Sequence, residues 1–388
     1  MKLGWGRTIS TYVASASAYV ACIGLASAQV GSDQKPQIAE DVFKNIQVLK
    51  GTSVDEFMAT MGFFSASTGL NCTDCHISES SGDWARYADD TGLKRVARRM
   101  VLMVNTLNKG DFGGRRAVTC YSCHRGKEYP KAIPSLAEQY GVPSPDDPNE
   151  IEILAQVPAT PSADQILGRY IQALGGSERL AALTSFAAQG TYQGFDTDFG
   201  EVPVDVFAKA PGQRTTIVHT LLGDSTRTFD GRAGWIAAAD KPVPLLTLTG
   251  KDLDGLKLDA ELSFPAGIKQ ALGQLRTGFP KTAIGGRDVQ IIQGTGAGGS
   301  RVKLFFDKES GLLVRVVRYT ETAVGVVPTQ TDYSDYREVA GVEMPFHWTV
   351  TWTDGRSTTE LSAVQPNVRI DAAKFAKPAS AASKPADR

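Results

Sequence analysis

Histidine and cysteine are scarce in this chain of 388 residues, which has four histidines and five cysteines. Neither sign of charge is in excess, because 41 basic residues balance 42 acidic ones and leave a formal net charge of −1. The chain as a whole therefore gives no case for nucleic acid or another polyanion as a partner. Beyond the N-terminal region, no segment is apolar enough to cross a membrane. The length is sufficient for two globular domains.

Residues 1–28 have the pattern of a secretory signal peptide. Two basic residues precede an alanine-rich apolar stretch, and an A-x-A site ends at Ala28, so we expect cleavage there. Two alternatives stay open: an uncleaved membrane anchor, because the stretch is nearly long enough to span a bilayer, and lipidation of Cys22. All three predict an exported, periplasmic protein, and the uncleaved segment would attach it to the membrane.

The other four cysteines form two C-x-x-C pairs, and a histidine follows each pair directly. The two motifs are NCTDCH and TCYSCH, with Cys72, Cys75 and His76 in the first and Cys120, Cys123 and His124 in the second. Exported proteins commonly use cysteine for disulfides, but such pairs make a poor disulfide framework. Three other chemistries compete: a zinc site, a redox-active dithiol and covalent haem attachment.

The spacing favours haem. A four-cysteine zinc site would leave both histidines unexplained, and its halves would be further apart than in a zinc ribbon. A thioredoxin-like dithiol needs one pair in a βαβ setting. C-x-x-C-H is the attachment sequence of c-type haem: the thiols form thioethers with the vinyl groups, and the histidine is an axial iron ligand. Two copies predict two covalently bound haem c groups.

Methionine supplies a second pattern. Methionine as the other axial ligand of a haem iron raises the redox potential. Of six methionines, four occur as one pair ahead of each motif: Met58 and Met61, and Met100 and Met103. We expect one methionine of each pair to be a ligand and the other to pack in the core.

Both methionine pairs lie on predicted helices. Ser53 and Glu56 form an S-x-x-E capping pattern at the start of the first helix, which Gly69 is expected to end. The apolar periodicity predicts the second helix over residues 91–108.

The stretch DVFKNIQVLKGTSVDEFMATMGFFSASTGLNCTDCH, and RVARRMVLMVNTLN followed by VTCYSCHRG, resemble the tetrahaem cytochrome subunit of photosynthetic reaction centres over about residues 38–135. The resemblance implies axial ligands for each iron: His76 and Met61 for the first haem, His124 and Met100 for the second, and Met58 and Met103 as fallbacks. It also implies redox donor and acceptor proteins as partners, with a membrane electron-transfer complex among the candidates.

This chain departs from the family in two respects. The family subunit has four haems, whereas only two motifs occur here. A histidine that the family places between the second methionine and the second motif is also absent, because that stretch reads KGDFGGRRA. The resemblance therefore supports a dihaem electron carrier without showing that it serves a photosynthetic reaction centre.

Local charge differs between the two motifs. Residues 71–90 carry five acidic side chains and one basic one, whereas residues 109–131 carry six basic and two acidic ones. Solvated surface would account for this, and so would donor and acceptor docking at opposite ends by charge complementarity.

The chain is expected to divide into a signal peptide (1–28), a small, mostly α-helical dihaem cytochrome c domain (29–135), a Pro-rich linker or covering arm (136–161), an antiparallel β domain (162–376) and a disordered tail (377–388). Alternating runs separated by turns predict the β domain, with helices near its start and over residues 265–275. FDKESGLLVRV and YSDYREVAGVEMPFHW loosely resemble the half-barrel of periplasmic lipoprotein carriers. The fold class is thus multidomain α + β.

The β domain lacks a recognisable catalytic motif. His219 and His347 are its only histidines, and neither has a carboxylate or serine partner at motif spacing. We expect them to be packed or satisfied residues, and GTGAGGS (294–300) to be a hairpin loop. The curved sheet could hold an apolar ligand or dock a protein.

Three function classes remain. The favoured one is an exported dihaem c-type cytochrome that transfers electrons and is not an enzyme. A dihaem peroxidase is the second, but it needs an open iron. The third is a periplasmic lipid- or lipoprotein-binding protein with an accessory haem domain.

Overall fold

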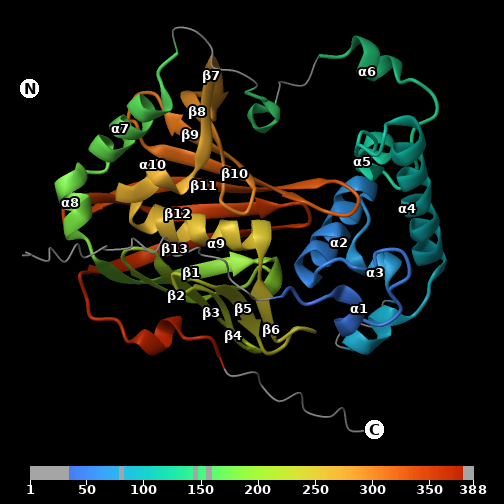
Figure 1. The fold of residues 1–388 in the computed structure, drawn as a ribbon, viewed down its shortest axis with the longest axis horizontal. Coiled ribbons are helices and arrows are strands. Elements are labelled where there is room, and N and C mark those ends of the chain that lie inside the picture. Colours follow the sequence, from blue (N-terminus) through green and yellow to red (C-terminus); the bar gives the residue numbers. More distant parts are fainter. Residues whose placement is uncertain (1–34, 78–82, 143–146, 154–159, 379–388) are drawn as a thin grey trace, which may run out of the picture. The chain divides into compact units, whose positions relative to one another are not determined.

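The computed structural model describes residues 35–77, 83–142, 147–153 and 160–378. The expected signal peptide and nearly all of the expected C-terminal tail lie outside these residues. A group of helices comes first, and a large antiparallel β-sheet with its own helices follows (Figure 1). Within the described part of the chain, no helix is both long enough and apolar enough to cross a membrane.

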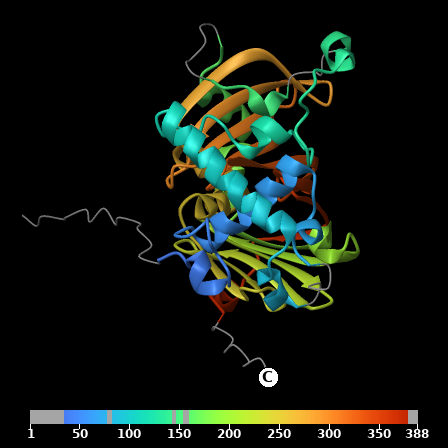
Figure 2. The ribbon, with the colours of Figure 1, turned by 90° about the vertical axis from the view of Figure 1, so that its right-hand side faces the viewer.

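The first region is helical, as predicted. It contains five α-helices and one 3₁₀ helix in its described residues: α1 (Ala39–Val42), α2 (Val54–Thr68), α3 (Cys72–Cys75), η2 (Trp84–Ala88), α4 (Gly92–Asp111) and α5 (Cys120–His124). Figure 2 views the molecule from the side on which α4 lies.

The two long helices begin where the sequence predicts. The Ser53 hydroxyl accepts the Glu56 N–H at the start of α2, and the Thr91 hydroxyl accepts the Lys94 N–H at the start of α4. Each bond satisfies a backbone donor that the first helical turn leaves free. Gly69 ends α2 with a φ of 71°, and a Cβ there would lie 2.6 Å from the Gly126 carbonyl oxygen. Glycine is therefore required by both its backbone conformation and the close approach of the second motif's loop.

The second region is one sheet of thirteen strands in its described residues. They are β1 (Ser185–Gly194), β2 (Glu201–Lys209), β3 (Gln213–Thr220), β4 (Gly223–Phe229), β5 (Gly234–Ala238), β6 (Leu245–Leu248), β7 (Gly273–Ile284), β8 (Arg287–Thr295), β9 (Arg301–Asp307), β10 (Leu313–Glu321), β11 (Val326–Val339), β12 (Val342–Trp352) and β13 (Gly355–Pro366). The spatial order is β6-β5-β4-β3-β2-β1-β13-β12-β11-β10-β9-β8-β7, and neighbours pair antiparallel. The sheet is open, so the expected fold class is confirmed.

Burial in the sheet follows the pleat. Val204, Val206 and Ala208 are buried in β2 at a spacing of two residues, as expected for a strand with one covered face. The helices of this region are α7 (Ala163–Ala173), α8 (Ser177–Ala182), α9 (Gly250–Ser263) and α10 (Ile268–Ala271). Buried residues of α7, α8, α9 and α10 share the main core with the strands.

Two elements differ from the expectation. The helix predicted over 265–275 consists of a 3₁₀ turn (Pro265–Gly267) and the short α10, and the chain is already in β7 from Gly273. The sequence analysis also missed α9. This helix buries Asp254 and Gly255 as well as leucines, so it lacks a clean apolar stripe.

Part of the Pro-rich segment, residues 147–153, packs on the sheet. It forms the 3₁₀ turn η3 (Pro148–Glu150), and Ile153 is buried in a cluster with Val289, Ile291 and Phe305. The ammonium of Lys303, whose side chain is fully buried, donates to the carbonyl oxygens of Asn149 and Ile151. The described residues 147–153 thus lie as an arm against β8–β10, while the boundary at residue 161 stays a prediction.

Candidate functional site

Each C-x-x-C-H motif forms a short, doubly capped helix. In α3, Asn71 and Asp74 exchange bonds: the Asn71 side chain accepts the Asp74 N–H at 3.0 Å, and the Asp74 carboxylate accepts the Asn71 N–H at 2.8 Å. Thr119 and Ser122 form the same reciprocal pair in α5. Helical geometry places residues three and four apart on one face, so the two thiols of each motif share a side of their turn. His124 lies within α5, whereas His76 follows α3 as its C-cap, with an extended backbone.

The two motif histidines make the same hydrogen bond. Nδ1 of His76 lies 3.0 Å from the Tyr87 carbonyl oxygen, and Nδ1 of His124 lies 3.0 Å from the Lys127 carbonyl oxygen. A carbonyl can only accept, so in the neutral imidazole Nδ1 carries the proton and Nε2 keeps its lone pair. This is the tautomer that a metal ligand needs, and the outer hydrogen bond fixes the orientation of its ring.

The four motif thiols are free, and burial raises the pKa of Cys72, Cys75 and Cys120. Catalytic dithiols show the opposite shift, because their chemistry requires a thiolate. Within the described ranges, no group of three or more His, Cys, Asp or Glu side chains is arranged to hold a metal ion. Attachment of haem through thioethers requires neither a lowered thiol pKa nor a cluster of metal-binding side chains.

The candidate methionines differ in exposure. Met61 packs against a cluster that we call the helical core, which consists of Leu49, Phe63, Val101, Cys120, Val324 and Val327. Met58 is 51% exposed and Met103 is 45% exposed, whereas Met61 and Met100 are half-buried. The expectation that the other methionine of each pair packs in the core is therefore wrong for Met58 and Met103.

The helix contacts do not follow the chain order of the motifs. Helix α2 contacts α5, and α4 contacts both α3 and α5. Met61, ahead of the first motif, therefore lies on a helix that packs against the second. The pairing of each methionine with a histidine stays a prediction.

One face of α4 is apolar and uncovered. Val96, Met103 and Leu107 are exposed, and Met100 lies between them at helical spacing. The buried face of the helix, with Val101 and Val104, is a separate one. An exposed apolar stripe on a helix that contacts both motif helices fits a large apolar macrocycle.

His76 is more enclosed than His124. Its ring packs against the Tyr87 ring at a centroid distance of 4.6 Å, and Tyr87 packs against Trp84 at 5.0 Å. Burial lowers the pKa of His76, which favours the neutral imidazole that binds metals. Sequence patterns could not reveal the hydrogen bonds of His76 and His124, because their acceptors are backbone carbonyls.

In the β region, His219 is satisfied, as expected, but by partners that the sequence analysis missed. Its Nδ1 lies 2.8 Å from Asp224 and its Nε2 lies 3.2 Å from Asp205. Strand pairing, not motif spacing, brings these carboxylates to the ring. The expected hairpin loop between β8 and β9 is present, and there Gly298 and Ser300 donate hydrogen bonds to Asp254.

Comparison with known proteins bears on the helical region. The family model of the photosynthetic reaction centre cytochrome C subunit matches residues 11–161. The photosynthetic reaction center cytochrome c subunit of Thermochromatium tepidum is 42% identical over 98 residues, which are 24% of this chain and 23% of that protein. The subunit of Roseobacter denitrificans is 33% identical over 105 residues, or 25% of this chain and 28% of that one. The resemblance seen in the sequence is confirmed.

The chain spans only about a quarter of the length of these curated relatives.

Among solved structures, a LolA superfamily protein from Nitrosomonas europaea aligns with 56% of this chain and 99% of its own, at a TM-score of 0.39 and 14% identity. A putative outer membrane lipoprotein-sorting protein domain from Vibrio parahaemolyticus aligns with 54% of this chain and 97% of its own, at a TM-score of 0.37 and 10% identity.

Proposed function

We propose that this protein is an exported c-type cytochrome that carries two covalent haems and transfers electrons. The first haem would be attached to Cys72 and Cys75, with His76 as a ligand. The second would be attached to Cys120 and Cys123, with His124. The observation that carries the proposal is the shared geometry of the two histidines, whose protonated Nδ1 atoms leave Nε2 free for iron.

Bound haem c would supply one-electron chemistry between ferric and ferrous iron. The chain's own contribution is attachment and orientation. The capped turns α3 and α5 hold the two thiols of each motif, and the backbone carbonyls of Tyr87 and Lys127 orient the imidazole rings. Met61 and Met100 are the proposed sulfur ligands, because they are half-buried while their neighbours Met58 and Met103 are exposed.

We assign the β region a supporting role at the second motif. Val324, at 2% exposure, lies in the loop between β10 and β11, and Val327 lies at the start of β11; both pack in the helical core together with Cys120. The sheet thereby supplies part of the apolar surroundings of the second site, where low polarity tunes the potential of a haem. Its open surface remains the proposed docking face for a protein or an apolar ligand.

Redox proteins are the proposed partners, and a periplasmic location follows from the signal pattern of residues 1–28. The relatives are named as reaction centre subunits, which makes a membrane electron-transfer complex the first partner to test. Docking of a redox partner at the basic residues 109–131 can be tested by charge reversal. Arg115 is the better position for it than Arg116, because Arg116 also donates to the Gly325 carbonyl oxygen at 3.5 Å.

Haem stoichiometry tests the proposal. We expect the mass of the purified protein, made in a host with haem-attachment machinery, to exceed that of the polypeptide by two haems. A double variant, Cys72→Ala with Cys75→Ala, should retain one haem, while Tyr121→Phe, at an exposed position inside the second motif, should retain both. A wild-type protein without covalent haem, or a double variant that still carries two, would overturn the proposal.

A further inference from the structure

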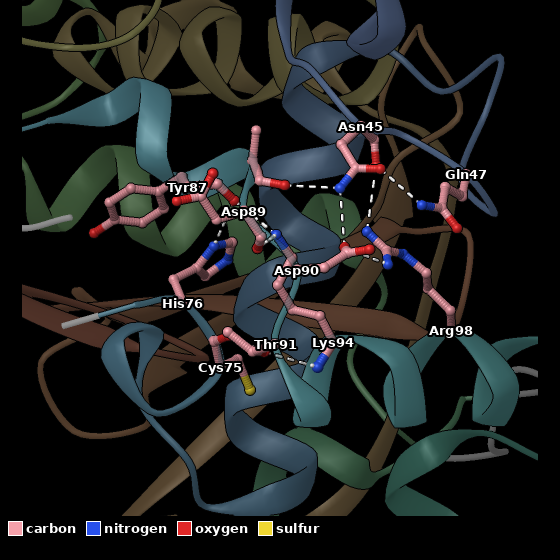
Figure 3. Close-up of polar contacts among 11 residues, drawn as sticks. Asn45, Gln47, Cys75, His76, Tyr87, Asp89, Asp90, Thr91, Lys94 and Arg98 are labelled. Carbon is pink, nitrogen blue, oxygen red and sulfur yellow. Dashed lines mark hydrogen bonds and ion pairs between the residues drawn. The ribbon is translucent and has the colours of Figure 1, made fainter. Parts of the chain in front are cut away.

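The Tyr87 carbonyl oxygen lies beside two donors. Nδ1 of His76 is 3.0 Å away, and the Lys94 ammonium is 2.7 Å away (Figure 3). The same ammonium also donates to the Asp89 carbonyl oxygen at 2.7 Å. A lysine of α4 therefore competes directly for the acceptor that holds the motif histidine.

The second motif lacks this competitor. The Lys127 carbonyl oxygen accepts from His124 at 3.0 Å, and no side chain of the described residues shares that carbonyl. In both motifs a backbone carbonyl oxygen accepts the hydrogen bond of the histidine Nδ1, but within the described residues only in the first motif does that oxygen also accept from a lysine. Hydrogen bonds at the far side of a ligating imidazole affect the metal through the imidazole.

We propose that Lys94 is a positioning residue that raises the redox potential of the first haem. The proposal rests on the proposed function, in which His76 binds the first iron. A carbonyl that already accepts from an ammonium has less electron density to offer the imidazole N–H. The imidazole then donates less strongly to iron, which favours the ferrous state. The positive charge of Lys94 acts in the same direction, because ferric iron carries more charge than ferrous iron.

The loop that carries the carbonyl is held in place. Asn45 donates to the Ala88 carbonyl oxygen at 2.7 Å and to the Asp90 carboxylate at 2.9 Å. Arg98 pairs with Asp90 at 2.7 Å. The Thr91 hydroxyl donates to the Cys75 carbonyl oxygen at 2.7 Å, so the loop is tied to the motif itself.

Charges of both signs surround Lys94. Burial, followed by the charge of Arg98, lowers the pKa of its ammonium, and the charges of Asp90 and Asp89 oppose this shift without cancelling it. Asp90 is engaged by Arg98, and Asp89 lies 3.4 Å from Arg86. The carbonyls of Tyr87 and Asp89 are therefore the direct partners of the Lys94 ammonium, which explains why this side chain folds back over the loop.

Lys94→Met is the decisive substitution, because it keeps the length of the side chain and removes both the charge and the donor. Arg95→Met is the matched control, since Arg95 is the next residue of α4 and is exposed. Lys94→Arg keeps the charge and should restore most of the effect. All three are titrated potentiometrically as full-length dihaem protein. A parallel set with Cys120→Ala and Cys123→Ala, which retains the first haem alone, assigns the component that moves.

We expect Lys94→Met to lower the potential of the first haem by about 59 mV, a tenfold change in its oxidised-to-reduced ratio. The second haem and the Arg95→Met protein should keep their potentials. Equal shifts in Lys94→Met and Arg95→Met, or no shift in Lys94→Met, would overturn the proposal. Faster hydrogen exchange over residues 87–91 without a shift would also overturn it, by showing a structural role only. Absence of haem from the wild type would instead refute the proposed function.

Discussion

The far end of the Phe63 ring of α2 lies against Gly325 at the tip of the β10–β11 hairpin. A Cβ built on Gly325 would lie 2.2 Å from the ring's Cζ and 2.4 Å from a Cε. Phe63 belongs to the helical core with Cys120 and Val324. The sheet and the second haem motif therefore share one packed interior, and the absence of a side chain at residue 325 permits the contact.

Gly325→Ala should destabilise the protein by about 1–3 kcal/mol, because the new methyl group must displace the Phe63 ring or the hairpin. Urea unfolding followed by circular dichroism measures the change. Gly212→Ala is the control, since a Cβ there meets nothing within 4 Å, and it should change the free energy of unfolding by less than about 0.5 kcal/mol. Equal stability of the two variants would show that the Phe63–Gly325 contact is not tightly packed.

A second contact between α2 and the β region joins two carboxyl groups. Asp252 of α9 forms a side-chain hydrogen bond with Asp55 of α2, and burial, followed by the charge of Asp55, raises the pKa of Asp252 to about 7. Arg318 and Arg227 oppose the shift without cancelling it. A hydrogen bond between two carboxyl groups requires a proton on one of them, so the folded state retains a proton that the unfolded chain releases near pH 3.8.

The contribution of Asp252 to the stability of the protein should therefore fall as the pH rises from 3.8 to about 7. The folded state binds more protons than the unfolded state between the two pKa values, so each rise in pH within that window favours unfolding. Asp252→Asn should flatten the dependence, measured as the free energy of unfolding in urea at several pH values. Asp111→Asn, at the exposed end of α4, should keep the wild-type slope.

The difference between the wild type and Asp252→Asn is the informative quantity in that experiment. Asp224, followed by Asp205, raises the pKa of His219 against the opposing effect of burial. Its contribution is also lost as the pH rises, and it is present in both proteins. Identical slopes for the wild type and Asp252→Asn would show that Asp252 is ionised in the folded protein at pH 5.

Replacement of a sulfur ligand by histidine should lower the potential of the haem concerned, because methionine favours ferrous iron. We expect Met61→His to shift one potentiometric component downward by more than 59 mV, a tenfold change in its oxidised-to-reduced ratio. Met58→His, one turn away at an exposed position, should leave both components in place. The opposite result would move the ligand to Met58, which the sequence analysis kept as the fallback.

The sequence predicted the parts of the site that depend on local spacing. The two motifs, the start of each long helix and the glycine that ends α2 all follow from short patterns around Ser53, Gly69 and Thr91. Contacts that join distant segments were not predictable. The Tyr87 carbonyl next to His76 and the position of Gly325 next to Phe63 have no sequence signature, because backbone groups make these contacts.

The same distinction holds in the β region. Eleven of the thirteen strands correspond to alternating runs in the sequence, whereas strands β6 and β7 and helix α9 were missed. In α9, Gly255 interrupts the helical pattern because the Arg318 guanidinium occupies the space where a Cβ would lie, with Nη1 only 1.9 Å from that position. Glycine at position 255 leaves room for the Arg318 side chain, and because glycine disfavours a helix it weakens the helical pattern in the sequence.

A potentiometric titration of the haem α-band, with carbon monoxide added to a reduced sample, tests the central proposal most directly. Two irons closed by histidine and methionine predict two positive midpoint potentials and an unchanged spectrum in the presence of carbon monoxide. A low potential together with a carbon monoxide spectrum would reveal an open iron. That result would contradict an electron carrier with two His–Met haems and favour a peroxidase-type enzyme instead.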